Sequence, residues 1–143
     1  MSWLRDLRDK EPPEPMKPIG IIVIGNLAPD RHDLPKEKVR KALKREQFKT
    51  VNLGVSVSPE DFLSLAFENK ANIIAISINT NKAKENLEKF IGLCEPLGPV
   101  LPYIIIGGSA VTIEDARKYG IIYGDSAEEA VKIAKSLVKG KKE

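Results

Sequence analysis

The chain has 143 residues, of which 42% are hydrophobic and 30% charged, and its formal net charge at pH 7 is +3. This length and apolar content are typical of one globular domain, and so small a positive charge gives no reason to expect a nucleic-acid partner. The only cysteine, Cys94, excludes a disulfide framework, and we expect it to be an inert buried thiol. No apolar run approaches the roughly 20 residues that cross a bilayer, and the first residues lack a signal-peptide core. We therefore expect a cytoplasmic protein with no membrane partner.

Residues 1–18 are predicted to form an N-terminal extension and proline-rich linker ahead of a folded domain, residues 19–143. Four prolines between positions 11 and 18 fix φ and remove backbone donors, which favours a stiff, extended chain. This composition is typical of a disordered tail. The alternative is a docking peptide with Trp3 as its anchor.

Apolar runs alternate with amphipathic segments through the rest of the chain. The predicted strands are residues 19–24, 50–53, 73–77, 103–106 and 121–123. Several of these runs are continuously apolar, which is typical of strands covered on both faces. Helices are predicted over residues 35–47 and after the N-cap residues Ser58, Thr112 and Ser126, each of which precedes an acidic residue by three positions. The alternation predicts an α/β fold, a doubly wound five-stranded parallel sheet with the flavodoxin-like (Rossmann-like) order 2-1-3-4-5.

The predicted helix over residues 35–47 is strongly basic. Between positions 36 and 45 it has six Lys or Arg residues against one acidic residue, Glu37. Val39 and Leu43 share the face that points toward the core, so the charges are predicted to form a solvated face. The alternative is a surface for an acidic partner or nucleic acid, but no aromatic residues interleave with these charges to stack on bases.

A candidate site lies in the loop after the first strand. Ligands of such a sheet bind beyond the carboxyl ends of strands one and three, and this loop carries the only histidine, His32, two residues after Asp30. An imidazole can bind a metal while a carboxylate holds its other ring N–H, although a lone histidine in a polar loop is more often an idle surface residue. The loops that begin at Ser77 and Gly107 flank the same point.

Several other chemistries of this fold are excluded by residue type. A phosphoacceptor receiver domain needs aspartate at the end of the third strand and lysine at the end of the fourth, where this chain has Ser77 and Gly107. The loop after the first strand lacks the run of hydroxyls that binds a flavin phosphate, and neither G-x-G-x-x-G nor G-x-x-x-x-G-K occurs. With one imidazole and no G-x-S-x-G sequence, a nucleophilic triad is not expected.

The spacing of the remaining motifs resembles the cobalamin-binding domain of adenosylcobalamin mutases, methionine synthase and corrinoid methyl-transfer proteins. The signature of that family begins with D-x-H-x-x-G, followed after about 41 residues by S-x-L. Asp30 and His32 match the first motif, and Pro35 takes the place of its glycine. Forty-one residues separate Pro35 from Ser77, which matches the serine.

The second half of the signature is a G-G pair some 26 to 28 residues after S-x-L. Asn79 takes the place of the leucine, and 27 residues separate it from Gly107 and Gly108, which match the pair. The resemblance covers residues 19–139. Two departures stand out: Pro35 has no N–H and cannot adopt a positive φ, and Asn79 puts an amide where an apolar side chain would pack on the cofactor.

The resemblance implies a role for each matching residue. His32 would be the lower axial ligand of cobalt in the base-off, His-on mode, and Asp30 would hydrogen-bond to it and raise its basicity. The displaced nucleotide tail would enter a slot between strands one and three. Ser77 would donate a hydrogen bond to the benzimidazole nitrogen, and Gly107 and Gly108 would leave room for the tail.

The implied cofactor is cobalamin, as adenosylcobalamin or methylcobalamin, and the implied partner is a separate catalytic subunit. We expect a cofactor-carrying subunit like the small subunit of glutamate mutase, without turnover of its own. The chain has no room for a mutase barrel, which needs roughly 250 residues. Only 18 residues precede the first strand, too few for the N-terminal helical bundle of corrinoid methyl-transfer proteins. The alternatives are a corrinoid methyl carrier for a methyltransferase, and a degenerate domain with a regulatory or assembly role.

Overall fold

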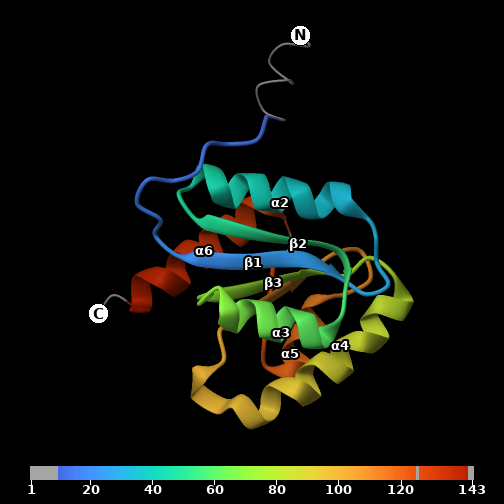
Figure 1. Ribbon diagram of the computed structural model, residues 1–143. Coiled ribbons are helices and arrows are strands. Elements are labelled where there is room, and N and C mark those ends of the chain that lie inside the picture. The colour runs from blue at the N-terminus through green and yellow to red at the C-terminus, as the bar shows by residue number, and fades with distance from the viewer. Residues whose placement is uncertain (1–9, 125, 142–143) are drawn as a thin grey trace.

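The computed structural model describes residues 10–124 and 126–141, which form a parallel five-stranded sheet with helices on both faces (Figure 1). The strands are β1 (Ile21–Leu27), β2 (Lys49–Val57), β3 (Ile73–Ser77), β4 (Tyr103–Gly107) and β5 (Ile122–Tyr123). Their order across the sheet is β2-β1-β3-β4-β5, and every pair is parallel. The predicted fold class and strand order are therefore confirmed.

The helices divide between the two faces of the sheet. They are α2 (Asp33–Arg45), α3 (Pro59–Glu68), α4 (Asn81–Cys94), α5 (Ile113–Tyr119) and α6 (Ala127–Lys141), with a 3₁₀ turn, η1 (Glu95–Val100), after α4. Helices α3, α4 and α5 pack on one apolar cluster and α2 and α6 on the other. Three of the predicted helix starts are confirmed, because the hydroxyls of Ser58, Thr112 and Ser126 each accept a backbone N–H three residues on.

Two strands extend beyond their predicted ends. β1 continues through Gly25 and Asn26 to Leu27, and β2 continues through Gly54 to Val57. The pairing of these strands changes register at Gly25, and Gly54 has a φ of +90°, so a bulge interrupts the ladder there. Glycine and asparagine are weak strand formers, which is why the apolar runs alone did not predict these residues.

Cys94 is buried near the end of α4, as predicted, and burial raises the pKa of its thiol to about 11. Among the described residues, none of the helices combines the length and the apolar character needed to cross a membrane.

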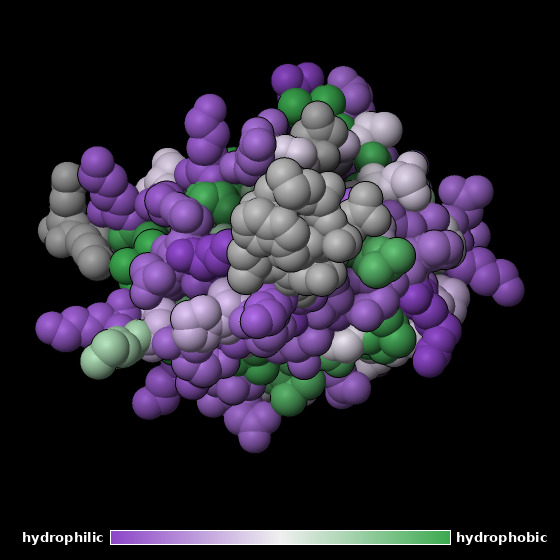
Figure 2. All heavy atoms as spheres, turned by 90° about the horizontal axis from the view of Figure 1, so that it is seen from above, coloured by the Kyte–Doolittle hydropathy of each residue, from purple (hydrophilic) through white to green (hydrophobic). Residues whose placement is uncertain are grey.

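The prediction of a solvated basic face on α2 is wrong for Lys36, Arg40 and Lys44, which are 1%, 7% and 6% exposed. These residues are four positions apart and form one stripe along the helix. Lys36 Nζ lies 2.8 Å from Asp33 Oδ1 and donates to Asn52 of β2 over 2.8 Å. The stripe is thus buried by partners of opposite charge and by β2. Other basic residues of the helix, Lys38 and Arg45, are exposed, and the surface seen from above is largely hydrophilic (Figure 2).

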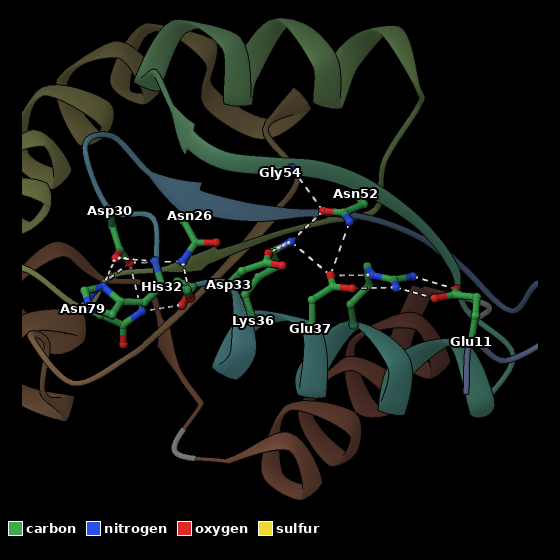
Figure 3. Close-up of polar contacts among 12 residues, drawn as sticks. Glu11, Asn26, Asp30, His32, Asp33, Lys36, Glu37, Asn52, Gly54 and Asn79 are labelled. Atoms are coloured by element: carbon green, nitrogen blue, oxygen red, sulfur yellow. Dashed lines mark hydrogen bonds and ion pairs between the residues drawn. The ribbon is translucent and has the colours of Figure 1, made fainter. Parts of the chain in front are cut away.

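The N-terminal segment contributes the other partners of this stripe. Glu11 accepts hydrogen bonds from Arg40 over 2.8 Å and from Lys44 over 2.6 Å, and Glu14 lies 2.8 Å from Lys44. Pro12, between them, is buried. The expectation of disorder is therefore wrong for residues 11–14, which bind to α2. Figure 3 shows the contact of Glu11 at its right side. Trp3, the anchor of the alternative docking peptide, lies outside the described residues.

Candidate functional site

His32 is the residue that precedes α2, at the carboxyl edge of the sheet. Its side chain is 62% exposed, while the side chain of Asp30 is fully buried beneath it. His32 Nδ1 lies 2.6 Å from Asp30 Oδ1. Because an ionised carboxylate only accepts hydrogen bonds, Nδ1 holds the proton in the neutral imidazole, and Nε2 is then the nitrogen with a free lone pair. This is the arrangement that the sequence predicted for a metal-binding imidazole.

Asp30 is held by a set of converging donors, at the left of Figure 3. Its Oδ1 also accepts the backbone N–H of His32, and its Oδ2 accepts from the side-chain amide of Asn26 and from both the backbone and side-chain N–H groups of Asn79. Burial alone raises the pKa of this carboxyl, but the hydrogen bonds from His32, Asn26 and Asn79 outweigh burial and hold its pKa below the ordinary value. Asp30 is therefore an anion that orients the imidazole.

Asn79 links this carboxylate to the rest of the site. Its side-chain amide donates to Asp30 Oδ2 over 2.9 Å and to Ser77 Oγ over 3.1 Å, and its carbonyl oxygen accepts the backbone N–H of Ser109 over 2.9 Å. The loops after β1, β3 and β4 are thereby joined through one side chain. Asn79 was predicted from the sequence as a cofactor-binding residue at a position where the family has leucine, and its role in linking these loops was missed.

Asn26 was also missed. It is fully buried at the end of β1, and its amide donates to Asp30 Oδ2 and to the carbonyl oxygen of His32. A buried asparagine that directly follows an apolar strand and precedes an Asp-x-His motif was the signal that could have indicated it, because buried amides need partners.

The two glycines of the G-G pair allow close approaches between backbones. A Cβ at Gly108, whose φ is +119°, would lie 2.2 Å from the carbonyl oxygen of Ile78, and a Cβ at Gly107 would lie 2.7 Å from that of Gly124. Any side chain here would push the β4 loop away from its neighbours. Both glycines also line a cavity, together with Ser77 and Asn79.

The cavity has a volume of about 560 Å³ and opens between the sheet and helices α2 and α6. Its lining includes Ile22, Ile24, Ile73, Ala75 and Ile105 from the sheet, Pro35, Val39 and Leu43 from α2, and Ala127 and Ala130 from α6. The structure therefore brings all the predicted site residues to one edge of the sheet. Four of them line the cavity: Ser77, Asn79, Gly107 and Gly108. The other two are connected to it by hydrogen bonds, from Asn79 to Asp30 and between Asp30 and His32.

This arrangement of sheet, ligand loop and cavity agrees with the comparison to known families. The profile of the B12 binding domain matches residues 20–134, which is most of the chain. The chain belongs to the B12-binding domain family. The cofactor of that family is cobalamin, so the family and the cofactor predicted from the sequence are both confirmed.

The relatives of this B12-binding domain include corrinoid proteins of Methanosarcina mazei. The chain is 32% identical over 127 residues to dimethylamine corrinoid protein 1, covering 87% of the chain and 59% of the relative. It is 35% identical over 130 residues to trimethylamine corrinoid protein 1, covering 85% and 57%. The chain thus spans less than two thirds of the length of these relatives. They favour the methyl carrier among the alternatives, and they give no support to the mutase subunit expected first.

The fold is shared with the methanol:cobalamin methyltransferase complex of Methanosarcina barkeri. The TM-score is 0.81 at 23% identity, and the match covers 87% of this chain and 48% of the other.

The residues of the site suit a corrinoid. His32 offers one exposed imidazole, which is what a metal needs when a macrocycle supplies its other ligands. No group of three or more His, Cys, Asp or Glu side chains that could hold a metal ion occurs in the part of the chain that the structure describes. The cavity, which Asn79 connects to Asp30 and His32, has a mostly apolar lining with two polar residues, Ser77 and Asn79. A planar heterocyclic base would suit such a lining.

Proposed function

We propose that this B12-binding domain carries a methyl group on a bound corrinoid for a separate methyltransferase subunit. The observation that carries the proposal is the His32–Asp30 pair: an exposed imidazole, oriented by a buried carboxylate, beside an apolar cavity. The methylamine corrinoid proteins among its relatives support the methyl-carrier role rather than the mutase role. A bound corrinoid supplies a cobalt centre that accepts a methyl group from a donor and passes it to an acceptor.

The residues of the chain would divide the remaining work. His32 would hold the cobalt of a corrinoid through Nε2, and Asp30 would keep the ring proton on Nδ1 and stabilise positive charge on the imidazole. Asn79 would keep Asp30 in place and fix the edge of the cavity where Ser77 meets the nucleotide tail.

Cofactor binding is tested by absorption spectroscopy. The purified chain is mixed with hydroxocobalamin, desalted and scanned beside His32→Ala and a control, Arg31→Ala, which alters the exposed neighbour. We expect wild type and Arg31→Ala to retain corrinoid with a His-on spectrum, and His32→Ala to lose corrinoid or shift it toward base-off. If all three proteins retain corrinoid with the same spectrum, His32 is not the ligand. If the folded wild type retains no corrinoid, the result favours a degenerate domain.

The methyl-carrier role needs a second measurement. The cofactor-loaded chain is reduced and mixed with the catalytic subunit of the methanol:cobalamin methyltransferase complex and methanol, with the corrinoid subunit of that complex as positive control. We expect the spectrum of the bound cofactor to change to that of its methylated form. If the positive control is methylated and this chain is not, that donor is excluded, and the same assay is then run with methylamines and their methyltransferases.

A further inference from the structure

Among the described residues, those that line the cavity carry charge of only one sign. Among its described lining residues there are two lysines, Lys36 and Lys38, and no carboxylate. The rest of the lining is apolar or uncharged, with the isoleucines of β1, β3 and β4 as its floor. A ligand that complements this cavity is apolar at one end and negatively charged at the other.

The charge of Lys36 is already compensated. Its Nζ lies 2.8 Å from Asp33 Oδ1 and 3.0 Å from Glu37 Oε2, and it donates to Asn52 over 2.8 Å. With a side chain that is 1% exposed and three acceptors around it, Lys36 has no donor left for a ligand.

Lys38 differs from Lys36 in each of these respects. It is exposed, and no carboxylate of the described residues lies within ion-pair distance of it. None of the residues one helical turn away, Leu34, Pro35, Lys41 and Ala42, carries a negative charge. The neighbouring Glu37 is bound by Lys36 and Arg40. Lys38 is therefore a cation at the cavity whose three N–H donors are available to a bound anion.

We propose that Lys38 binds the phosphate of the cofactor's nucleotide loop, so that this domain selects complete corrinoids over those without the loop. The inference rests on the proposed function, because it assigns one part of the same cofactor. The nucleotide loop joins an apolar base to a phosphodiester. The base matches the isoleucine floor, and the phosphate matches the one uncompensated cation of the described lining.

The test compares three ligands that differ in this loop: hydroxocobalamin, cobinamide phosphate, which has the phosphate but no base, and cobinamide, which has neither. Dissociation constants are measured by absorption titration for wild type, Lys38→Gln and Lys38→Arg. The matched control is Lys132→Gln, which removes an exposed lysine of α6 that does not line the cavity.

We expect Lys38→Gln to weaken the binding of hydroxocobalamin and cobinamide phosphate by about threefold to tenfold, and to leave cobinamide unchanged. Lys38→Arg keeps the charge and should stay within about twofold of wild type, as should Lys132→Gln. The difference in affinity between Lys38→Gln and wild type should become smaller when the salt concentration is raised from about 50 mM to about 500 mM, because salt screens an exposed ion pair.

Two results would overturn the inference and leave the proposed function intact. One is equal weakening of all three ligands by Lys38→Gln, which would mean that Lys38 only supports helix α2. The other is no change for any ligand. If wild type binds none of the three corrinoids, the proposed function fails and this assignment fails with it.

Discussion

The chemistry of the site depends on one buried carboxylate. Asp30 is fully buried and receives hydrogen bonds from His32, Asn26 and Asn79, so its charge is compensated by donors rather than by a cation. The pair of Asp30 and His32 was predictable because both residues stand in one short motif. The partners Asn26 and Asn79 were not, because they come from the ends of two different strands and only the fold brings their amides together.

Replacing Asp30 by Asn removes the charge and turns one acceptor into a donor that faces other donors. We expect Asp30→Asn to lower the free energy of unfolding by about 1–3 kcal/mol, measured by urea denaturation at pH 7. The pKa of Asp30 is depressed in the folded state, so its contribution is present above the unfolded pKa near 4 and is lost as the pH falls below it. The variant should lack this part of the acid sensitivity.

The control for this substitution is Asp61→Asn, at an exposed position of the first turn of α3. It should change the stability by no more than about 0.5 kcal/mol. Equal effects of the two substitutions would mean that the donors around Asp30 contribute little.

Among the elements, helix α2 is held in an unusual way. It forms one wall of the cavity, which Val39 and Leu43 help to line. Much of its attachment is ionic: the stripe Lys36, Arg40 and Lys44 pairs with Asp33, Glu37, Glu11 and Glu14. The partners Asp33 and Glu37 stand in the same helix, but Glu11 and Glu14 lie about 30 residues away in the chain, and only the fold shows that they dock on this stripe.

Glu11 therefore tethers α2 to the N-terminal segment. We expect Glu11→Gln to cost no more than about 1 kcal/mol of global stability, because its side chain is half exposed, yet to speed hydrogen exchange of the α2 amides. The control, Glu60→Gln, breaks a surface ion pair to Lys89 and should leave α2 exchange unchanged. Unaltered exchange in Glu11→Gln would show that apolar contacts suffice to hold the helix.

Acid should act on the same tether. Hydrogen bonds from Arg40, acting against burial, lower the pKa of Glu11 and of Glu37 to about 2, from the ordinary 4.5. Because both folded-state values are depressed, this stabilisation is complete above pH 4.5 and declines as the pH falls toward 2. In a pH series, protection of the α2 amides should decline in that window, and Glu11→Gln should reduce the decline.

At the scale of the whole molecule, the two faces of the sheet are packed to different degrees. The face under α3, α4 and α5 packs on the larger apolar cluster, which includes Phe62 and Phe90, and these two rings meet edge to face. The face under α2 and α6 encloses the cavity. The alternation of apolar runs and caps was enough to predict the fold, but both faces present similar apolar stripes in the sequence. Ala75, on the middle strand of the sheet, lines the cavity with a small side chain, a feature that the apolar pattern of the strand does not reveal.

This difference can be tested by adding the same three carbons to one buried alanine on each face. Ala75 lines the cavity, whereas Ala66 of α3 is fully buried in the larger apolar cluster. We expect Ala66→Leu to destabilise the fold by about 1–3 kcal/mol through overpacking, whereas Ala75→Leu should stabilise it by up to about 2 kcal/mol through added burial. Urea denaturation of both variants measures the two changes.

Ala75→Leu should at the same time weaken the retention of hydroxocobalamin, because the added side chain occupies space that the nucleotide loop would take. Equal destabilisation by the two substitutions would mean that the cavity cannot accept a side chain. A stable Ala75→Leu variant with wild-type affinity would mean that the loop binds elsewhere. A gain in stability joined to a loss of binding would show that the cavity is kept open, at a cost in stability, to admit the cofactor.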